Sequence, residues 1–368
     1  MTTLMRPALR AITRNTRDAH ADLLQQRGLP LWESGNKSEK NKLIERITHT
    51  TVPNHYHLAL ARWIGLTRNN NRFTSTVLRC ENRLYIGLAT GNTLETGVHT
   101  HHSYGVPYLP GSSIKGAVRH YAEQNGLAPA YLDELFGGDS ETGEPSGALV
   151  WHDAWWLPLN ERDRPYISEV VTVHHQEYYN GKTPQADGRE SPIPNQQIAT
   201  GGAYYFVIEG APDWTRYALG LLNATLEHQG FGSKTASGYG YFRRDDNAAC
   251  DKRINDIHNL WIKNQKAANE TVRVAALPAH ERLAHAILSR LGEHAKTYSD
   301  RNQEKNLQLH RIILEELQQA TNNLDPAART QLADALAFPT LNAACKGFYS
   351  GKKEKEIKAA LRQLRGEA

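Results

Sequence analysis

The spacing of hydrophobic and polar positions predicts helices near the N-terminus of the chain. TRDAHADLLQQRGL, residues 16–29, carries its apolar residues at helical spacing, and Gly28 followed by Pro30 is typical of a helix end. HYHLALARWIGL, residues 55–66, has a similar pattern. We therefore expect residues 1–78 to form an N-terminal helical segment.

The period changes farther along the chain, where strands are predicted to alternate with helices. Leu84, Ile86 and Leu88 recur at every second position, which predicts a first strand. A helix ending near Gly126 follows, because its apolar residues share one face: Ile114, Ala117, Val118 and Tyr121.

The same reading gives four more elements between the first helix and residue 248. They are a strand at 147–157, a strand at 203–210, a helix capped by Asp213 and stopped by Gly230, and a short strand at 237–243. The order strand, helix, strand, strand, helix, strand is that of the ferredoxin-like fold, which also underlies RNA-recognition modules. We expect an α+β protein with a ferredoxin-like core at residues 79–248.

Two segments depart from a minimal core of this kind. Residues 160–200 form an insertion between the second and third strands that is too long for a plain connection, and loops of that length are usually functional or disordered. Residues 249–368 read as a C-terminal helical extension, with helices at 280–295, 308–323 and 354–368 separated by breaks at 299–306, 325–329 and 349–354.

Composition narrows the class of protein without deciding its function. A chain of 368 residues with 39% hydrophobic content can bury one substantial core with an appended unit. The net charge of +4 permits a polyanionic partner. The three cysteines are too far apart for a zinc knuckle or a disulfide framework. With no membrane-length apolar run and no secretory signal, we expect a cytoplasmic protein without a membrane partner.

The stretch YGVPYLPGSSIKGAVRHYAEQNG, residues 104–126, places turn-forming residues directly ahead of two cations. Gly111 and Gly116 allow close backbone approach, and Ser112 or Ser113 is suited to capping the helix or to donating a hydroxyl to a phosphate. Lys115 and Arg119 are spaced i and i+4, so they share a helix face. Two interpretations stay open: a phosphate cradle, or a capped helix whose cations point into water.

A second glycine-rich stretch, QGFGSKTASGYGYF at 229–242, favours the first interpretation. It spaces four glycines, Gly230, Gly232, Gly238 and Gly240, around Ser233, Lys234 and Thr235. It is not a nucleotide-binding P-loop, because the spacing differs from G-x-x-x-x-G-K-[ST] and the context is helix to strand. ATP hydrolysis is therefore not expected.

Five segments in order resemble the RAMP superfamily of CRISPR proteins. They are LYIGLATGNTLETGVHTHHSYGVPYLPGSSIKGAVR, HDAWW, VVTVHHQEYYNG, SPIPNQQIATGGAYYF and GFGSKTASGYGYF, which span about residues 80–243. Within the superfamily they are most similar to the sixth-subunit family of the type III-B (Cmr) effector complex. The resemblance implies a core that binds guide RNA near its 3′ end, alongside target RNA and other RAMP subunits.

Carried onto this chain, the resemblance implies roles for three groups of residues. The helix start would contact phosphates through Gly111, Ser112, Ser113, Lys115, Gly116 and Arg119. The glycine-rich loop from Gly230 to Gly240 would lie against the same RNA. The insertion at 160–200 would be a thumb-like element that enters the guide–target duplex through His174, His175, Gln176, Tyr178 and Tyr179.

Histidines and one aspartate raise the alternative of an enzyme. His101 and His102, with His174 and His175, lack the further ligands of a closed zinc site, so we expect hydrogen bonds to RNA or to a neighbouring subunit. Asp153 is the carboxylate to test for metal-dependent cleavage, since RAMP relatives that cut target RNA use an aspartate. A strand aspartate beside an apolar core more often accepts structural hydrogen bonds. We expect a non-catalytic RNA-binding subunit without cofactor or metal; a RAMP endoribonuclease and a protein-interaction subunit remain the alternatives.

Overall fold

The computed structural model describes residues 2–6, 19–32, 37–68, 71–88, 94–138, 146–186, 193–244, 248–299 and 302–367. The chain divides into two compact units, residues 1–262 and 263–368. Helices and antiparallel sheets are mixed in the first unit, whereas the described part of the second is helical, so the predicted α+β class is confirmed.

An antiparallel sheet forms the centre of the first unit. Its strands follow the order β10-β3-β9-β6-β4, and β5 pairs with β9 beyond the end of β6. The bounds of these strands are β3 (Phe73–Cys80), β4 (Tyr108–Leu109), β5 (Val150–Trp151), β6 (Ala154–Leu157), β9 (Ala203–Glu209) and β10 (Phe242–Arg244).

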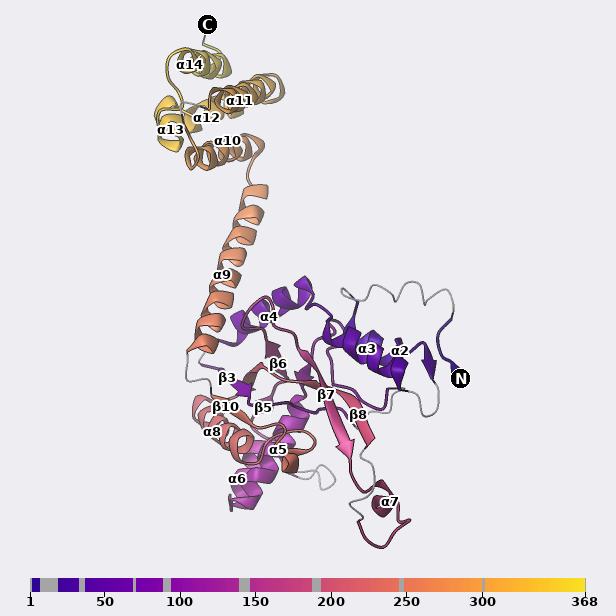
Figure 1. The fold of residues 1–368 in the computed structure, drawn as a ribbon. Helices are drawn as coiled ribbons and strands as arrows, with labels where there is room; N and C mark the ends of the chain where they lie inside the picture. Colours follow the sequence, from indigo (N-terminus) through magenta and orange to yellow (C-terminus); the bar gives the residue numbers. More distant parts are fainter. Residues whose placement is uncertain are drawn as a thin grey trace. The chain divides into compact units, whose positions relative to one another are not determined.

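Helices cover both faces of this sheet (Figure 1). On one face, Thr67 at the end of α4 (Asn54–Thr67) contacts the Tyr205 hydroxyl, with 2.9 Å between the two oxygens. On the other face, Thr74 contacts Thr215 of α8 (Pro212–His228) at 2.6 Å. Thr74 pairs with Ile208 of β9, so these two side chains lie on the same face of the sheet. Ile208 is three residues from Tyr205, and side chains alternate between faces along a strand, so Thr74 and Tyr205 lie on opposite faces. Helix α5 (Gly111–Gln124) packs beside α8, and α6 (Pro129–Phe136) packs against α5.

The prediction of a first strand at Leu84–Leu88 is wrong. The first strand of the central sheet is β3, Phe73–Cys80, most of which lies in the segment 1–78 that was expected to be helical. Leu84 and Tyr85 form only isolated bridges, to Thr200 and Ser233. Neighbouring residues from Leu84 to Ile86 are all buried, so their alternation does not reflect an inner and an outer sheet face.

The insertion is a β-hairpin and not an irregular loop. β7 (Tyr166–Val173) pairs with β8 (Ile193–Thr200) in antiparallel register, and the short helix α7 (Gln176–Tyr179) follows β7 (Figure 1). Helix α3 (Ser38–Thr48) packs against the hairpin, and the Lys40 Nζ donates a hydrogen bond to Asn195 Oδ1 at 3.2 Å. Residues 187–192 of the insertion lie outside the described residues.

The predicted N-terminal helices are confirmed at residues 21–27 and 54–67, and residues 16–18 of the first prediction lie outside the described residues. The first corresponds to α2 (Ala21–Arg27), which ends at Gly28, and the second to α4. A two-stranded sheet of β1 (Thr2–Thr3) and β2 (Leu31–Trp32) accompanies them. Among the described residues, no helix combines the length and the apolar character needed to cross a membrane.

The second unit has its own apolar core, formed by residues such as Ile287, Ile313 and Phe348. Its helices are α10 (Ala279–Ala295), α11 (Gln303–Asn323), α12 (Pro326–Ala335), α13 (Phe338–Ala344) and α14 (Lys352–Arg365), and α9 (Ala249–Ala275) precedes them. The three predicted helices are confirmed. The predicted break at 325–329 is wrong, because Asp325 caps α12 by accepting a hydrogen bond from Ala328 N.

Candidate functional site

A pocket of about 510 Å³ brings together the two stretches that the sequence singled out. Ser113 and Ala117 of α5 lie on one side of it, and residues 229–233 with Thr235 lie on another. The segment 85–88 and His99 complete the lining. The start of α5 and the glycine-rich loop therefore face a common space, although more than a hundred residues separate them in the sequence.

A β-bulge positions the start of α5. Trp151 pairs with Ile208 and Trp155 with Tyr205, so three residues after Trp151 oppose two on β9. The bulge directs the Asp153 carboxylate at the first turn of α5, where Oδ1 accepts a hydrogen bond from Gly111 N at 2.7 Å. A Cβ atom on Gly111 would lie 2.1 Å from the Trp151 carbonyl oxygen, so this contact requires glycine.

The prediction that Ser112 or Ser113 caps α5 is wrong. The helix begins earlier, with Pro110 in the N-cap position, and no side chain of the N-cap residue bonds to the first turn. Both serines are exposed within the helix. The cap comes instead from Asp153, which occupies a site where a negative charge is favoured by the helix dipole.

The glycine-rich loop folds closely against its own chain. Gly240 has a φ of +76°, and a Cβ there would lie 1.9 Å from the Phe231 carbonyl oxygen. At Gly232, with a φ of +88°, a Cβ would lie 2.3 Å from the Tyr85 carbonyl oxygen. The close backbone approach expected from the sequence is therefore an approach to other parts of this chain. Around these glycines, Lys234 and Gly238 are exposed, Ser233 and Thr235 are half-buried, and Gly230 is buried.

Lys115 and Arg119 lie away from the pocket. With about 100° of rotation per residue, Lys115 is about 200° around the helix from Ser113. The Arg119 guanidinium donates to the Gly137 carbonyl oxygen at 2.6 Å and to Glu123 Oε1 at 2.9 Å. Lys115 is half-buried and has no hydrogen-bond or ion-pair partner within the part of the chain that the structure describes. The two cations thus share a face, as predicted, but only Lys115 has its charge unpaired.

The two histidines before α5 have different surroundings. The His101 ring stacks on Tyr108 and lies near Trp155, with centroids 4.5 Å and 4.6 Å apart. Burial lowers the pKa of His101, and the Asp153 charge opposes that shift in part. His102 is exposed, and its Nδ1 lies 3.6 Å from Asp22 Oδ2.

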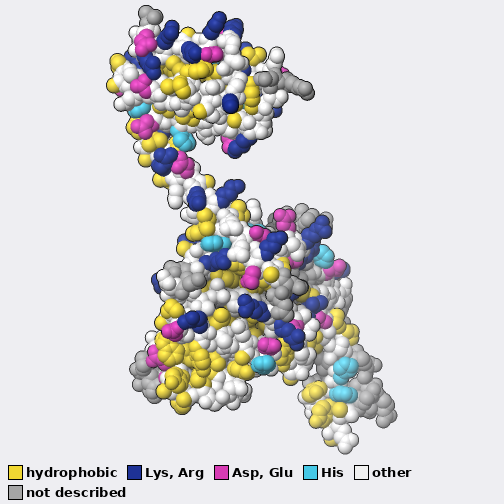
Figure 2. Space-filling model, turned by 90° about the vertical axis from the view of Figure 1, so that its left-hand side faces the viewer, with side chains coloured by type: hydrophobic (Ala, Val, Ile, Leu, Met, Phe, Trp, Pro, Cys, Tyr) yellow, Lys and Arg dark blue, Asp and Glu magenta, His cyan; other side chains and the backbone are white. Residues whose placement is uncertain are grey.

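The residues expected to act as a thumb lie at the end of the hairpin. Tyr178 and Tyr179 are 44% and 75% exposed, and their rings meet edge to face. His174 is exposed, and His175 adopts a φ of +58° before α7, to which Gln176 contributes the first residue. Figure 2 shows histidine and hydrophobic side chains gathered on this projection. They do not line the pocket at the start of α5.

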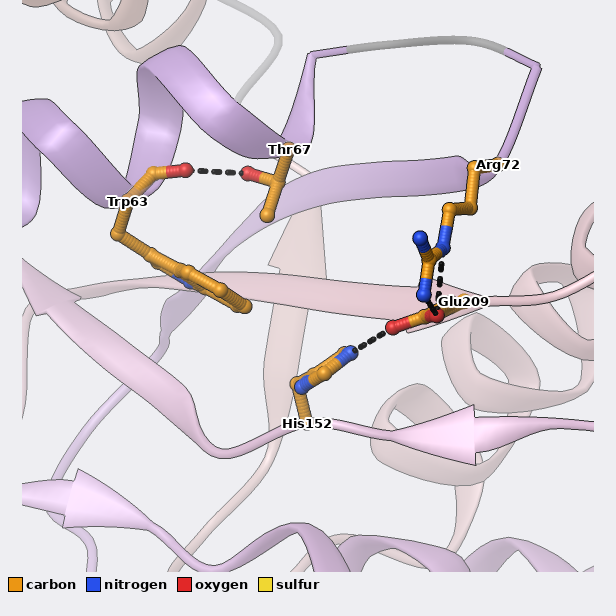
Figure 3. A network of polar contacts seen from close by, with 5 residues as sticks. All are labelled: Trp63, Thr67, Arg72, His152 and Glu209. Atoms are coloured by element: carbon orange, nitrogen blue, oxygen red, sulfur yellow. Dashed lines mark hydrogen bonds and ion pairs between the residues drawn. The ribbon is translucent and has the colours of Figure 1, made fainter.

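Sequence reasoning missed a polar network where β9 ends and β3 begins (Figure 3). Glu209 Oε2 lies 2.9 Å from His152 Nε2, and Glu209 Oε1 accepts a hydrogen bond from Arg72 Nε at 2.7 Å. Burial opposes ionisation of Glu209, but the bonds from His152 and Arg72 outweigh it and lower the pKa of the carboxyl. The His152 ring packs edge-on against Trp63, 5.1 Å away. Because its members come from distant segments, no local pattern indicates this network.

Comparison with known proteins identifies the family. Residues 77–243 match the RAMP superfamily. Over this region the chain is a RAMP, Cmr6-like protein. Cmr6 of Saccharolobus solfataricus is 28% identical over 169 residues, which cover 44% of this chain and 54% of that protein. Cmr6 of Pyrococcus furiosus is 25% identical over 227 residues, which cover 44% of this chain and 65% of that protein. The resemblance inferred from the five sequence segments is thereby confirmed.

The RAMP chain spans less than two thirds of the length of both relatives. Among solved structures, the type III-B Cmr-beta complex bound to cognate target RNA contains a chain that aligns with 19% identity and a TM-score of 0.43, covering 65% of this chain and 86% of that one. The crystal structure of Cmr6 from Pyrococcus furiosus aligns with 21% identity and a TM-score of 0.30, covering 47% of this chain and 98% of that one. No group of three or more potential metal-ligating side chains occurs among the described residues.

Proposed function

We propose that this RAMP protein is a non-catalytic RNA-binding subunit of a type III-B CRISPR (Cmr) effector complex. In this role it holds guide RNA near its 3′ end, beside other RAMP subunits in the cytoplasm, and contributes to target-RNA engagement in antiviral defence. The observation that carries the proposal is the pocket in which the start of α5 faces the glycine-rich loop.

The core supports this function because we assign it to the ferredoxin-like class. Strands β3 and β6 are both antiparallel to β9, which lies between them, so they run parallel to each other. A parallel pair joined through α5 and separated by a third strand is the arrangement of a split βαβ unit. RNA-recognition domains are built on the same order of elements.

The pocket offers groups of the kind that contact RNA backbones. Ser113 contributes a hydroxyl from α5, and Ser233 and Thr235 contribute hydroxyls from the loop. Hydroxyls and backbone N–H groups are common donors to phosphate oxygens, and such contacts fix the register of a strand without reading its sequence. Lys234 is exposed within the same loop and adds a positive charge. We assign the guide backbone to this pocket.

The hairpin is the proposed target-engaging element. Its exposed Tyr178 and Tyr179 rings provide flat apolar surfaces, and stacking of a base on an aromatic side chain is worth about 1–3 kcal/mol. Pairing of β7 with β8 forms the stem, and packing of α3 against both strands attaches the stem to the rest of the first unit. A stem that is paired along its length presents the tip at little further entropic cost.

Asp153 is assigned a structural role in this proposal. One of its carboxylate oxygens accepts the Gly111 N–H at 2.7 Å, so the side chain serves the helix that forms one wall of the pocket. That geometry favours a binding protein over an endoribonuclease in which Asp153 would hold a metal ion.

Two exposed helix glycines offer a matched test of the pocket. Gly116 in α5 is adjacent to the pocket residue Ala117, whereas Gly220 lies in α8. A Cβ atom at either position would meet nothing within 4 Å, so Gly116→Leu and Gly220→Leu are both compatible with the fold. Leucine is also a better helix former than glycine. The two variants therefore differ only in where they add bulk.

Guide-RNA affinity of the purified chain distinguishes the two variants. Gly116→Leu is expected to weaken binding by at least about tenfold, equivalent to about 1.4 kcal/mol, because its side chain obstructs an RNA strand lying along the helix start. Gly220→Leu should bind like the wild type. Equal affinities for both variants would contradict the assignment of the pocket, and absence of guide RNA from the natively purified wild-type complex would contradict the function itself.

A further inference from the structure

The positive charge of the chain is concentrated in its second unit. Residues 263–368 contain 17 Lys and Arg against 12 Asp and Glu, whereas residues 1–262 contain 26 Lys and Arg against 27 Asp and Glu. The proposed RNA pocket therefore lies in a unit with almost no net charge. A charge asymmetry of this kind indicates interaction of the basic part with a polyanion.

Helix α14 arranges part of this charge in a line, which we call the basic stripe: Lys355, Lys358, Arg362 and Arg365. The spacing i, i+3, i+7, i+10 places all four on one side of the helix. Ile357, Leu361 and Leu364 are buried and attach the helix to the core of the second unit. All four cations are exposed, over about 15 Å of helix.

Partners within the chain neutralise only part of the stripe. Lys358 pairs with Glu354, and Arg365 Nη2 lies 2.8 Å from Asp334 Oδ1. Lys355 and Arg362 have no ion-pair or hydrogen-bond partner within the described part of the chain. Residues 357–366, which surround Arg362, contain no carboxylate, whereas Lys355 is flanked by Glu354 and Glu356. These two carboxylates pair with Lys358 and Lys352.

Helix stability does not account for this arrangement. Cations near the C-terminus of a helix interact favourably with its dipole, which explains Arg362 and Arg365 in the last turn of α14. Cations near the N-terminus are unfavourable for the same reason. Lys352, Lys353 and Lys355 nevertheless lie in or next to the first turn, where Glu354 is the acidic residue. Lys352 lies 3.6 Å from Glu356, and Lys353 Nζ lies 4.5 Å from the centroid of the Phe348 ring. Lys355 has no such partner among the described residues, so the fold does not compensate its charge.

We propose that the basic stripe of α14 binds the phosphate backbone of RNA, as a contact separate from the pocket at α5. The choice of RNA as the polyanion rests on the proposed function. Exposed lysines and arginines contact phosphates without reading sequence, and each contact displaces counterions, so binding depends steeply on salt. The stripe therefore increases the affinity of the protein for RNA of any sequence.

The test uses the full-length chain and a labelled single-stranded RNA of mixed sequence. The stripe variant carries Lys355→Gln and Arg362→Gln, the two cations without partners. The control carries Lys263→Gln and Lys266→Gln on α9, which are also exposed and remove the same charge from the same unit. Circular dichroism verifies that each variant keeps its helix content.

Dissociation constants are measured over a range of salt concentrations. For single strands each phosphate contact contributes about 0.7 to the slope of log K against log salt, so loss of two contacts should reduce the slope of the stripe variant by about 1.4. Its affinity at low salt should fall, and the control should retain the wild-type slope. An unchanged slope in the stripe variant, or an equal reduction in the control, would overturn the proposal.

Three further outcomes separate this proposal from the others. If the stripe variant loses an acidic protein from the native complex while its salt slope stays at the wild-type value, the stripe binds protein and the inference is wrong. If Gly116→Leu weakens RNA binding but the stripe variant behaves like the wild type, the proposed function stands and only the stripe is excluded. If the stripe variant alone weakens binding, the stripe is supported and the pocket assignment is wrong.

Discussion

Substitution of Asp153 decides whether this carboxylate is structural. Asp153→Ala removes the acceptor of the 2.7 Å hydrogen bond from Gly111 N and a negative charge at the start of α5. Loss of a capping side chain costs about 0.5–2 kcal/mol, and loss of the charge–dipole interaction costs about 0.3–1 kcal/mol. We therefore expect Asp153→Ala to lower the free energy of unfolding by about 2 kcal/mol. Asp153→Asn keeps an oxygen acceptor and should cost about 0.3–1 kcal/mol.

Tryptophan fluorescence during urea unfolding measures this effect in the relevant unit. The seven tryptophans all lie in residues 1–262, so their emission reports the first unit and not the helical unit: Trp32, Trp63, Trp151, Trp155, Trp156, Trp214 and Trp261. A suitable control is Asp213→Ala, because Asp213 also lies in the first turn of a helix but its side chain is 91% exposed. The control should change the free energy of unfolding by no more than about 0.5 kcal/mol.

Two results would contradict a structural role for Asp153. If Asp153→Ala unfolds at the same urea concentration as the wild type, the carboxylate does not support α5. A metal-dependent cleavage of RNA that disappears in Asp153→Asn, without any loss of stability, would instead assign Asp153 to catalysis and would contradict the non-catalytic function.

Three other predictions test the remaining parts of the first unit. The pKa of Glu209 is held below its ordinary value of 4.5, so the carboxylate stabilises the fold above that pH. This contribution is lost as the pH falls through the lowered pKa. The urea midpoint of Glu209→Gln should therefore depend less on acid pH than that of the wild type. Gly238→Ala should cost about 1–2 kcal/mol for its left-handed backbone, whereas Gly240→Ala should cost more because of the additional contact with the Phe231 oxygen, and a larger loss at Gly238 would contradict the geometry of the loop. Replacing residues 174–190 with a short Gly/Ser linker should leave guide binding intact and reduce the target-RNA affinity of the assembled complex; unchanged target affinity would make the hairpin tip a passive loop.

Elements with a strong local pattern were predictable from the sequence. The apolar face of Ile114, Val118 and neighbouring residues gave α5, and the apolar run at 203–210 gave β9, which is buried on both sides of the sheet. The strand at 73–80 was missed because its first four residues are only half-buried and its sequence mixes Thr, Ser and Arg with apolar residues. Leu84–Leu88 had the clearer alternation, but it forms only isolated bridges, to Thr200 at the end of β8 and to Ser233 in the glycine-rich loop, and none to the central sheet.

Features that depend on distant segments were not predictable in the same way. Ser112 and Ser113 were the nearest capping residues to α5, yet the cap is Asp153, which is 42 residues away from Gly111 in the sequence. The bulge that directs Asp153 exists only once β5 and β6 have paired with β9. Long-range pairing of this kind leaves no periodic trace in either segment. The family resemblance led us to expect that the two glycine-rich stretches lie close together. That Lys115 and Arg119 lie outside the pocket could be seen only in the structure.

The structure also determines which glycine substitutions can report on RNA. Valine at Gly232 would collide with the Tyr85 carbonyl oxygen and would have to adopt a φ of +88°, so it disturbs the loop before any ligand is present. Loss of RNA binding in that variant would therefore be expected whether or not RNA touches the loop. Gly116 has a helical backbone and open space around it, so no requirement of the fold explains a glycine that weakens the helix by about 1 kcal/mol relative to alanine. Gly220 in α8 has the same open surroundings, so open space alone does not identify a ligand. Gly116 is the more informative position because a side chain there adds bulk next to the pocket residue Ala117 without disturbing the fold.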